Sequence, residues 1–373
     1  MLAPLHGVTR AGDANGTMLT FVVMPCLDEA VLVTDAVASL GFMDDATTAL
    51  EAHLIAVDNG STDGTLGVLE GLRRDRPQIH VVREAVRGFV PPRRRGVVEA
   101  ERLACSLGVP PERTLILQAD ADTVYREGYV ARMQGAAEGA TGAMFEGSIK
   151  PPPDFVAAHP AYLAAQRLVD DNTDPLDAED EDEVVLDDKV CGYRLADYLT
   201  WGGLFEERTA GGDAIHAETT RLFIRARLRH GARKIRVNPA GAIPSRRKVL
   251  FDPRLQYATV GFPREQSWIE AFTSGQGIDQ DVDAFAASVL DGLDLEAVRL
   301  RRAHQLALFR YLPALVAAAE DSIPVDQRPP DVASIIAALP SFSAENLAGH
   351  PGAALLALLN LIDTNPQLFV DLR

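Results

Sequence analysis

The first half of the chain alternates short apolar runs with helical patterns. Runs of mostly branched apolar residues predict buried strands, because a parallel strand covered on both faces needs no polar alternation. These runs cover residues 18–24, 53–57, 79–82 and 114–117. Helical patterns cover about 31–40, 66–74 and 94–106. This spacing predicts an α/β fold, a doubly wound and mostly parallel sheet with helices on both faces.

The pattern changes beyond about residue 280, where Ala- and Leu-rich helical periodicity takes over. The predicted helices cover 283–293, 295–319, 332–339 and 351–363, with one short helix after them. They predict a C-terminal all-helical domain over residues 280–373, which packs on a main domain over residues 18–270 or serves in oligomerisation. Residues 1–17 show no periodicity, and we expect a flexible arm there.

Polar motifs stand where three of the predicted strands end. They are Pro25-Cys26-Leu27-Asp28-Glu29 after the first strand, Asp58-Asn59-Gly60-Ser61-Thr62-Asp63-Gly64-Thr65 after the second, and Asp120-Ala121-Asp122 after the fourth. Ligands of open α/β sheets bind outside the carboxyl ends of the strands. The motifs therefore predict one ligand site at this edge of the sheet.

Asp120 and Asp122 are the strongest candidates for binding a metal ion. Side chains at i and i+2 of an extended segment point the same way, so both carboxylates can face one ligand. Two like charges repel, and a hard divalent cation such as Mg²⁺ or Mn²⁺ stabilises them, taking its other ligands from substrate phosphates. The alternative, a turn whose Asp residues cap the next helix, is the commoner reading of such a pair standing alone. The neighbouring motifs favour the metal.

Charge and cysteine content narrow the class of protein. The net charge of −17 argues against nucleic-acid binding, which needs a basic surface. Three cysteines, Cys26, Cys105 and Cys191, lie far apart and indicate neither a disulfide framework nor a zinc site. With no signal-peptide pattern and no apolar run long enough to span a membrane, we expect a cytoplasmic protein.

The three motifs FVVMPCLDEA, VDNGSTDGT and LQADADT, in this order, resemble those of the inverting glycosyltransferases of family 2, which have the GT-A fold. A fourth segment, over residues 201–239, resembles the acceptor-side segment of that family. The resemblance covers roughly residues 18–250. It implies that residues 18–270 are a catalytic domain, which uses Mn²⁺ or Mg²⁺ to transfer a sugar from a nucleotide-diphosphate donor to a hydroxyl acceptor.

The resemblance also assigns roles to single residues. It places Pro25, Asp28 and Glu29 on the nucleotide side of the site and Asp58 and Asn59 against the nucleobase. Asp120 and Asp122, the DXD motif, would bind the cation, with Asp120 also near the ribose. Asp213 would be the general base. Two positions depart from the family pattern. Position 59 is often Asp, which leaves the base preference open, and Gly212 replaces a glutamate that normally precedes the catalytic carboxylate.

Asp213 follows two glycines, and we expect it at the first positions of a helix. There the helix dipole would lower its pKa and keep it ionised as a proton acceptor. The alternative role is a helix N-cap. We expect His216 and Glu218 on the same helix as ordinary helix residues, and if Asp213 is not the base, Glu206, Glu207 and Glu218 are the next candidates.

Basic residues stand at two places near the predicted site. Three arginines at the predicted start of the helix 94–106 oppose its dipole unless an anion is nearby, so Arg93 and Arg94 are candidates for binding the diphosphate. The alternative is a solvated helix start. The same two interpretations stay open for the run Ser245-Arg246-Arg247-Lys248.

Residues 170–188 hold eleven Asp or Glu and no Lys or Arg, so −11 of the net charge of −17 comes from one run. Few apolar residues and strong self-repulsion predict a mobile inserted loop, poorly ordered over 174–184. The alternative is a lid or an acceptor-selecting element.

Two other functions compete with sugar transfer. A sugar-1-phosphate nucleotidyltransferase would need a Gly-rich phosphate loop after the first strand, where this chain has PCLDEA. A catalytically degenerate protein that binds a sugar nucleotide or acts as a scaffold is the non-enzymatic alternative. The glycine at position 212 favours it, and Asp120, Asp122 and Asp213 argue against it.

Overall fold

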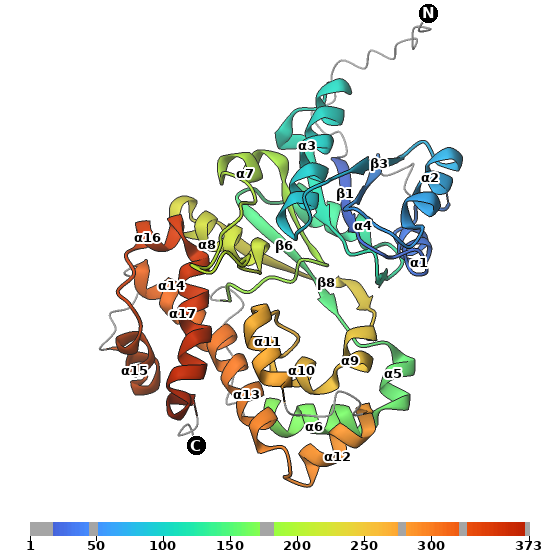
Figure 1. The fold of residues 1–373 in the computed structure, drawn as a ribbon. Helices are drawn as coiled ribbons and strands as arrows, with labels where there is room; N and C mark the ends of the chain where they lie inside the picture. Colours follow the sequence, from blue (N-terminus) through green and yellow to red (C-terminus); the bar gives the residue numbers. More distant parts are fainter. Residues whose placement is uncertain (1–17, 45–50, 172–182, 275–280, 321–326, 370–373) are drawn as a thin grey trace, which may run out of the picture.

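The computed structural model describes residues 18–44, 51–171, 183–274, 281–320 and 327–369. Within them one sheet has the strand order β3-β2-β1-β4-β7-β6-β8-β5 (Figure 1). Its strands are β1 Leu19–Cys26, β2 Ala52–Asp58, β3 Ile79–Arg83, β4 Thr114–Gln118, β5 Thr123–Tyr125, β6 Ala143–Ile149, β7 Cys191–Arg194 and β8 Arg233–Pro244. Strands β3, β2, β1 and β4 pair in parallel, as do β6 and β8, whereas β7 runs antiparallel to β4 and β6. The predicted mostly parallel α/β sheet is confirmed.

Helices cover both faces of the sheet and continue to the C-terminus. Those of the first two-thirds are α1 Val33–Ser39, α2 Thr65–Asp75, α3 Val90–Ser106, α4 Tyr129–Glu138, α5 Pro153–Ala158, α6 Pro160–Asp170, α7 Leu195–Thr200, α8 Glu218–His230, α9 Arg247–Phe251, α10 Pro253–Ala258 and α11 Gln266–Thr273. The later ones are α12 Val282–Leu290, α13 Leu295–Leu306, α14 Leu312–Ala319, α15 Pro330–Ala338, α16 Ala344–Gly349 and α17 Pro351–Thr364, with a π-helical turn, Ala307–Tyr311, between α13 and α14.

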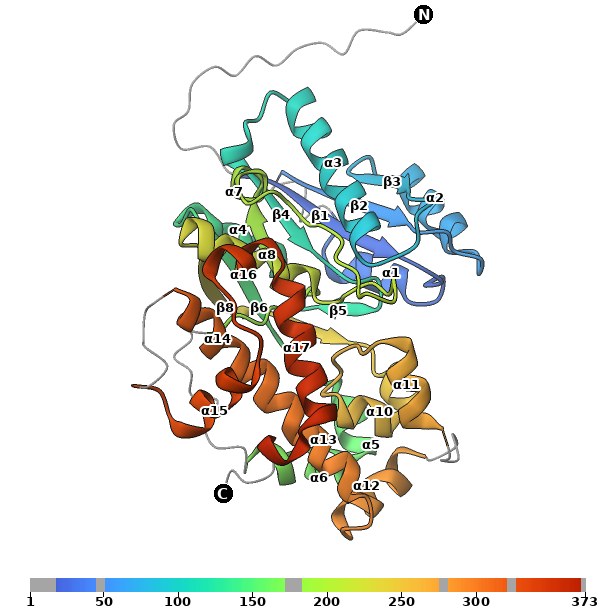
Figure 2. The same cartoon turned by 60° about the vertical axis from the view of Figure 1, so that its left-hand side comes forward.

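Strand β1 is apolar throughout because both of its faces are buried. Phe21 and Val23 belong to the core on the side of α3, while Val22 and Met24 belong to the core on the side of α1 and α4. Helix α3 lies against β1 and β2 (Figure 2). It can approach this closely because it presents Gly96, where an added Cβ would collide with the side chain of Val23.

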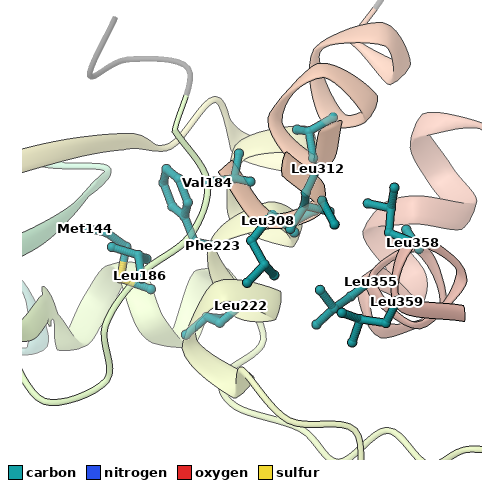
Figure 3. Packing of buried hydrophobic residues seen from close by; sticks show 14 of the residues in the cluster. Met144, Val184, Leu186, Leu222, Phe223, Leu308, Leu312, Leu355, Leu358 and Leu359 are labelled. Carbon is teal, nitrogen blue, oxygen red and sulfur yellow. The ribbon is translucent and has the colours of Figure 1, made fainter. Parts of the chain in front are cut away.

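The C-terminal helices share a hydrophobic core with one face of the sheet. Figure 3 shows side chains of β6, of the segment before β7, of α8 and of the C-terminal helices gathered together. The labelled residues are Met144, Val184, Leu186, Leu222, Phe223, Leu308, Leu312, Leu355, Leu358 and Leu359. Helix α8 lies between the sheet and the C-terminal helices, so these helices are packed against the rest of the chain. The C-terminal helical region is confirmed, and its division from residues 18–270 as a separate domain stays a prediction.

Two predicted helix starts are wrong. Helix α3 begins at Val90, four residues before the predicted start, because prolines are tolerated in a first turn whose N–H groups have no helical partner anyway. Arg93 and Arg94 therefore lie in the second turn of the helix. The helix predicted to begin near Asp213 begins at Glu218, so Asp213 is not on it.

The described ends of the acidic run are anchored. At the first residue of the run, the carboxylate of Asp170 accepts two hydrogen bonds from Arg301, at 2.8 Å each. In its second described part, Glu183 pairs with Lys234 at 2.9 Å, and Val184 is fully buried. The expectation of a poorly ordered loop over 174–184 is wrong for residues 183 and 184, because the ion pair holds Glu183 and Val184 joins the core. The rest of it lies outside the described residues.

No helix in the described parts of the chain combines the length and the apolar character that crossing a membrane requires.

Candidate active site

A cavity of about 680 Å³ lies at the edge of the sheet where β4 ends. Its volume is within the usual range for sites that bind small molecules. Side chains from both halves of the chain line it. The polar and aromatic ones include Phe89, Arg93, Asp120, Asp188, Lys189, His216, Glu218, Lys248 and Arg264.

The loops after β1 and β2 are tied together by side chains that bond to backbone groups. Asp28 has a left-handed backbone with a φ of 55°, and its carboxylate accepts a hydrogen bond from the backbone N–H of Thr62 at 2.7 Å. The hydroxyl of Thr65 accepts the backbone N–H of Glu29, also at 2.7 Å. Pro25 lies just before, paired with Val57 across the sheet. The VDNGSTDGT motif thus fixes the conformation of the first loop.

Asn59 is buried, and its side-chain amide holds the loop that leads to α3. Its Nδ2 donates to the carbonyls of Glu84 and Val86 at 3.0 and 2.8 Å, and its Oδ1 accepts the backbone N–H of Gly88 at 3.2 Å. An aspartate could not donate to the two carbonyls, which explains the amide at a position where the family often has Asp. The neighbouring Asp58 accepts the backbone N–H of Ser61 at 3.3 Å.

Arg93 lies at the centre of a buried polar cluster. Its guanidinium donates to Glu218 at 3.1 Å, to Gln118 at 3.0 Å and to Asp120 at 2.8 Å. Burial opposes its charge, but the carboxylates of Asp120, Asp188 and Glu218 together raise its pKa. Arg93 therefore joins the end of β4 to the start of α8.

Arg94, the other arginine predicted to bind the diphosphate, is exposed and does not line the cavity. The two side chains diverge because consecutive residues on a helix are about 100° apart.

Arg247, at the start of α9, makes the second link across the site. It donates to Glu29 at 2.7 Å, and its other terminal nitrogen lies 3.2 Å from Asp122. The backbone N–H of Ser245 donates to the carbonyl of Asp122 at 2.9 Å. Burial raises the pKa of Glu29 although Arg247 opposes the shift. The sequence suggested the basic run 245–248 but not which of its residues faces the carboxylates.

Asp188 is a cavity residue that the sequence analysis missed. Burial, and then the charge of Glu218, raise its pKa to about 7, with Arg93 opposing the shift. The acidic run obscured it, because its charge resembles that of its neighbours. The usable signal was its place close to β7, separated from the strand only by Lys189 and Val190.

Asp213 lies on an exposed hairpin. Arg208 and Ala214 form a bridge, and within it the backbone N–H of Thr209 donates to the carbonyl of Asp213 at 2.8 Å. Asp213 is not on a helix, so the argument from the helix dipole does not apply to it, and it does not line the cavity.

Glu218, and not Asp213, stands at the start of the helix that reaches the site. It is the first residue of α8, its side chain is 3% exposed, and it lines the cavity. His216 precedes it outside the helix, with its ring 4.5 Å from that of Phe89, and burial lowers its pKa. The prediction that His216 and Glu218 are ordinary helix residues is therefore wrong for His216, and Glu218 begins the helix at the cavity wall.

The two remaining acidic candidates lie elsewhere. Glu207 accepts the backbone N–H of Gly352 at 2.6 Å and lies 3.5 Å from Arg221, so it anchors the start of α17. Glu206 pairs with Arg208 on the hairpin at 3.4 Å.

Solved structures of glycosyltransferases are similar to this chain at low identity. The mannosyltransferase PcManGT from Pyrobaculum calidifontis, in complex with GDP-Man and Mn²⁺, is 16% identical over 94% of this chain and 88% of its own, with a TM-score of 0.46. S. aureus TarS 1-349 in complex with UDP-GlcNAc is 14% identical over 94% and 92%, with a TM-score of 0.43. No curated protein matches the sequence of the chain.

The family comparison concerns the part of the chain that carries the three strand-end motifs. Residues 21–150 match the model of glycosyl transferase family 2. The matched segment runs from β1 to the residue after β6 and includes Asp28, Asp58 and both carboxylates of the DXD motif. The resemblance noted in the sequence is confirmed over this segment: residues 21–150 match glycosyl transferase family 2, and this match supports a glycosyltransferase.

Proposed function

We propose that the protein transfers a sugar from a nucleotide-diphosphate donor to a hydroxyl acceptor, with inversion at the anomeric carbon, and that a divalent cation bound by Asp120 and Asp122 takes part. One observation carries the proposal. The two carboxylates stand at the end of β4, each next to an arginine, and Asp120 lines the 680 Å³ cavity.

The residues present fit such a cation. Carboxylate oxygens suit Mg²⁺ and Mn²⁺, which are commonly held by one or two carboxylates together with substrate phosphates. Among the described residues no group of three or more His, Cys, Asp or Glu could hold an ion by itself. The diphosphate would therefore complete the ligand set. When bound, the cation would supply positive charge for the leaving diphosphate.

The chain's own residues would do the rest. Arg247, which lies between Glu29 and Asp122, is the arginine best placed to contact the diphosphate, in place of Arg94. Arg93 would hold Asp120 and Glu218 in position. The loops that carry Asp28 and Asn59 would form the nucleotide side of the site.

The chemical step would be a single displacement. The acceptor oxygen forms a bond to the anomeric carbon, the bond from that carbon to the diphosphate oxygen breaks, and the acceptor proton passes to a carboxylate. Asp213 as that carboxylate stays a prediction from the resemblance. Among the other candidates named from the sequence, Glu218 is the alternative with the best support, because it lines the cavity and Asp213 does not.

The cation is tested with nucleoside diphosphates and Mn²⁺ in a thermal-shift assay. Asp122→Asn should lose the stabilisation that depends on Mn²⁺, while Asp154→Asn, at an exposed carboxylate of α5, should keep it. A full Mn²⁺-dependent shift in Asp122→Asn would place the cation elsewhere.

The base is tested by comparing Asp213→Asn with Glu218→Gln. The variant of the true base should lose about 10²–10⁴ in turnover with nearly unchanged donor affinity. Near-normal turnover in both variants would overturn both assignments.

The cytoplasmic location and an oligomer formed through the C-terminal helices stay predictions.

A further inference from the structure

A second cavity of about 590 Å³ adjoins the first, between α9, α10 and α11. These three helices lie together below the end of β8 (Figure 1). The residues that line both cavities are Lys248, Leu255, Gln256 and Ile269. A molecule that reaches the carboxylates of the DXD motif can therefore extend into the second cavity, which we call the α9–α11 groove.

The walls of the groove present mainly apolar atoms. Phe251 lines it and is 78% exposed, an unusual state for so large an apolar side chain beside a cavity. Polar wall residues use their side chains locally. Asp252 caps α10 by accepting the backbone N–H of Leu255 at 2.9 Å, and the hydroxyl of Thr273 donates to the carbonyl of Ile269 at 2.8 Å.

The basic side chains of the groove lie at the end that adjoins the candidate active site. Arg247 lines that end and contacts Glu29 and Asp122 of the candidate active site. Lys248 stands where the two cavities meet; it is exposed and has no ion pair among the residues that the structure describes. The groove thus matches a molecule with oxygen atoms at one end and a hydrocarbon body at the other.

We propose that the α9–α11 groove binds the apolar body of the acceptor, and that the acceptor is an amphiphilic alcohol. Its hydroxyl would lie in the first cavity, its polar end near Lys248, and its hydrocarbon part against Phe251, Leu255 and Ile269. This inference rests on the proposed function and adds the chemical class of the acceptor.

The test measures the binding of n-octyl β-D-glucopyranoside, below its micellar concentration, and of methyl β-D-glucopyranoside by calorimetry. The two probes share a polar end and differ in hydrocarbon length. We expect the octyl probe to bind at least about tenfold more tightly, because burying methylene groups is favourable.

Phe251→Ser should lower the affinity for the octyl probe about five- to tenfold and leave that for the methyl probe unchanged. Leu293→Ser is the matched control: Leu293 is 77% exposed, lies outside the groove and should have no effect. Thr273→Trp, which fills the groove from α11, should also weaken octyl binding selectively.

Equal affinity for both probes would overturn the proposal, and so would equal losses in Phe251→Ser and Leu293→Ser, which would indicate unspecific adhesion. Binding to phosphatidylcholine vesicles, or dimerisation, that depends on Phe251 without any octyl preference would show a membrane or a second copy as the occupant instead.

Nucleoside diphosphate with Mn²⁺ serves as the parallel measurement. A normal nucleotide shift without octyl preference overturns the groove assignment alone, whereas a missing nucleotide shift overturns the proposed function and with it the identity of the groove ligand as an acceptor.

Discussion

The two walls of the candidate site are held by different kinds of interaction. On the wall formed by the loops after β1 and β2, short polar side chains bond to backbone groups, as Asn59 does to three residues between 84 and 88. The other wall is held to the rest of the site by ion pairs between residues far apart in the chain. Arg93 reaches Glu218, 125 positions away, and Arg247 reaches Glu29, 218 positions away.

The two kinds of interaction predict different losses of stability when a residue is substituted. Most bonds of the first wall run from a side chain to backbone 25 to 36 positions away, so they define loop conformations once the first three strands have come together. A buried ion pair needs the whole fold, and losing one partner leaves the other charge buried without compensation. We therefore expect the loss of the buried Arg93 to cost more than a change in the first wall, and the loss of the more exposed Arg247 to cost less.

The largest effect should come from removing Arg93. Arg93→Gln leaves Asp120 and Glu218 without their shared cation, and we expect it to lower the free energy of unfolding by about 3–5 kcal/mol. Arg94→Gln, at the exposed neighbour, should change it by less than about 0.5 kcal/mol. Urea denaturation of both variants measures the difference. If they unfold alike, the Arg93 cluster does not hold the second wall together.

His304 should make the C-terminal side of the site sensitive to acid. Burial, and then the charge of Arg264, lower its pKa to about 4, while an unfolded histidine titrates near about 6.5. Between pH 6.5 and pH 4 the unfolded state binds a proton at this histidine and the folded state does not. The free energy of unfolding is therefore unaffected by His304 above about pH 6.5 and falls as the pH drops towards 4. By linkage the loss is about 2 kcal/mol at pH 5.

The measurement for His304 is the change in unfolding free energy between pH 7 and pH 5, in wild type and in His304→Gln. The variant should lose about 2 kcal/mol less over this range than the wild type. His230→Gln, at an exposed histidine, should follow the wild type. Equal pH dependence in wild type and His304→Gln would contradict the prediction.

Asn59→Asp tests the first wall. The carboxylate cannot donate to the carbonyls of Glu84 and Val86, and we expect a loss of about 1–2 kcal/mol in unfolding free energy, since these carbonyls belong to residues that are not fully buried. Asn238→Asp adds the same charge at an exposed position of β8 and should be nearly neutral. A neutral Asn59→Asp would mean that the amide does not hold this loop.

The smallest effect on stability should follow from removing Arg247. Its side chain is 44% exposed, so screening by solvent should keep the loss in Arg247→Gln below about 1 kcal/mol. Arg73→Gln removes an arginine that is 51% exposed and paired with Glu70, and it should lose as little. Only Arg247→Gln should weaken nucleoside-diphosphate binding in the presence of Mn²⁺, by about tenfold. Equal nucleotide affinity in both variants would remove Arg247 from the donor site.

Sequence patterns were sufficient where the structure depends on neighbours along the chain. The apolar runs predicted β1 to β4, because burial on both faces leaves a continuous signal in a short segment. The polar motifs predicted the edge of the sheet that carries the site, since parallel strands all end there. The family resemblance rested on these same segments, and residues 21–150 confirm it.

Only the tertiary structure decided which later residues complete the site. Glycines before Asp213 suggested a helix start, but the chain forms a hairpin there and the helix begins at Glu218. Glu218, and not Asp213, therefore lines the cavity. Asp188 looked like one more charge of an acidic run until packing buried it beside Glu218 and raised its pKa. The physical reason is range: hydrophobic periodicity and turn chemistry act over a few residues, whereas burial and ion pairing depend on segments that meet only in the folded chain.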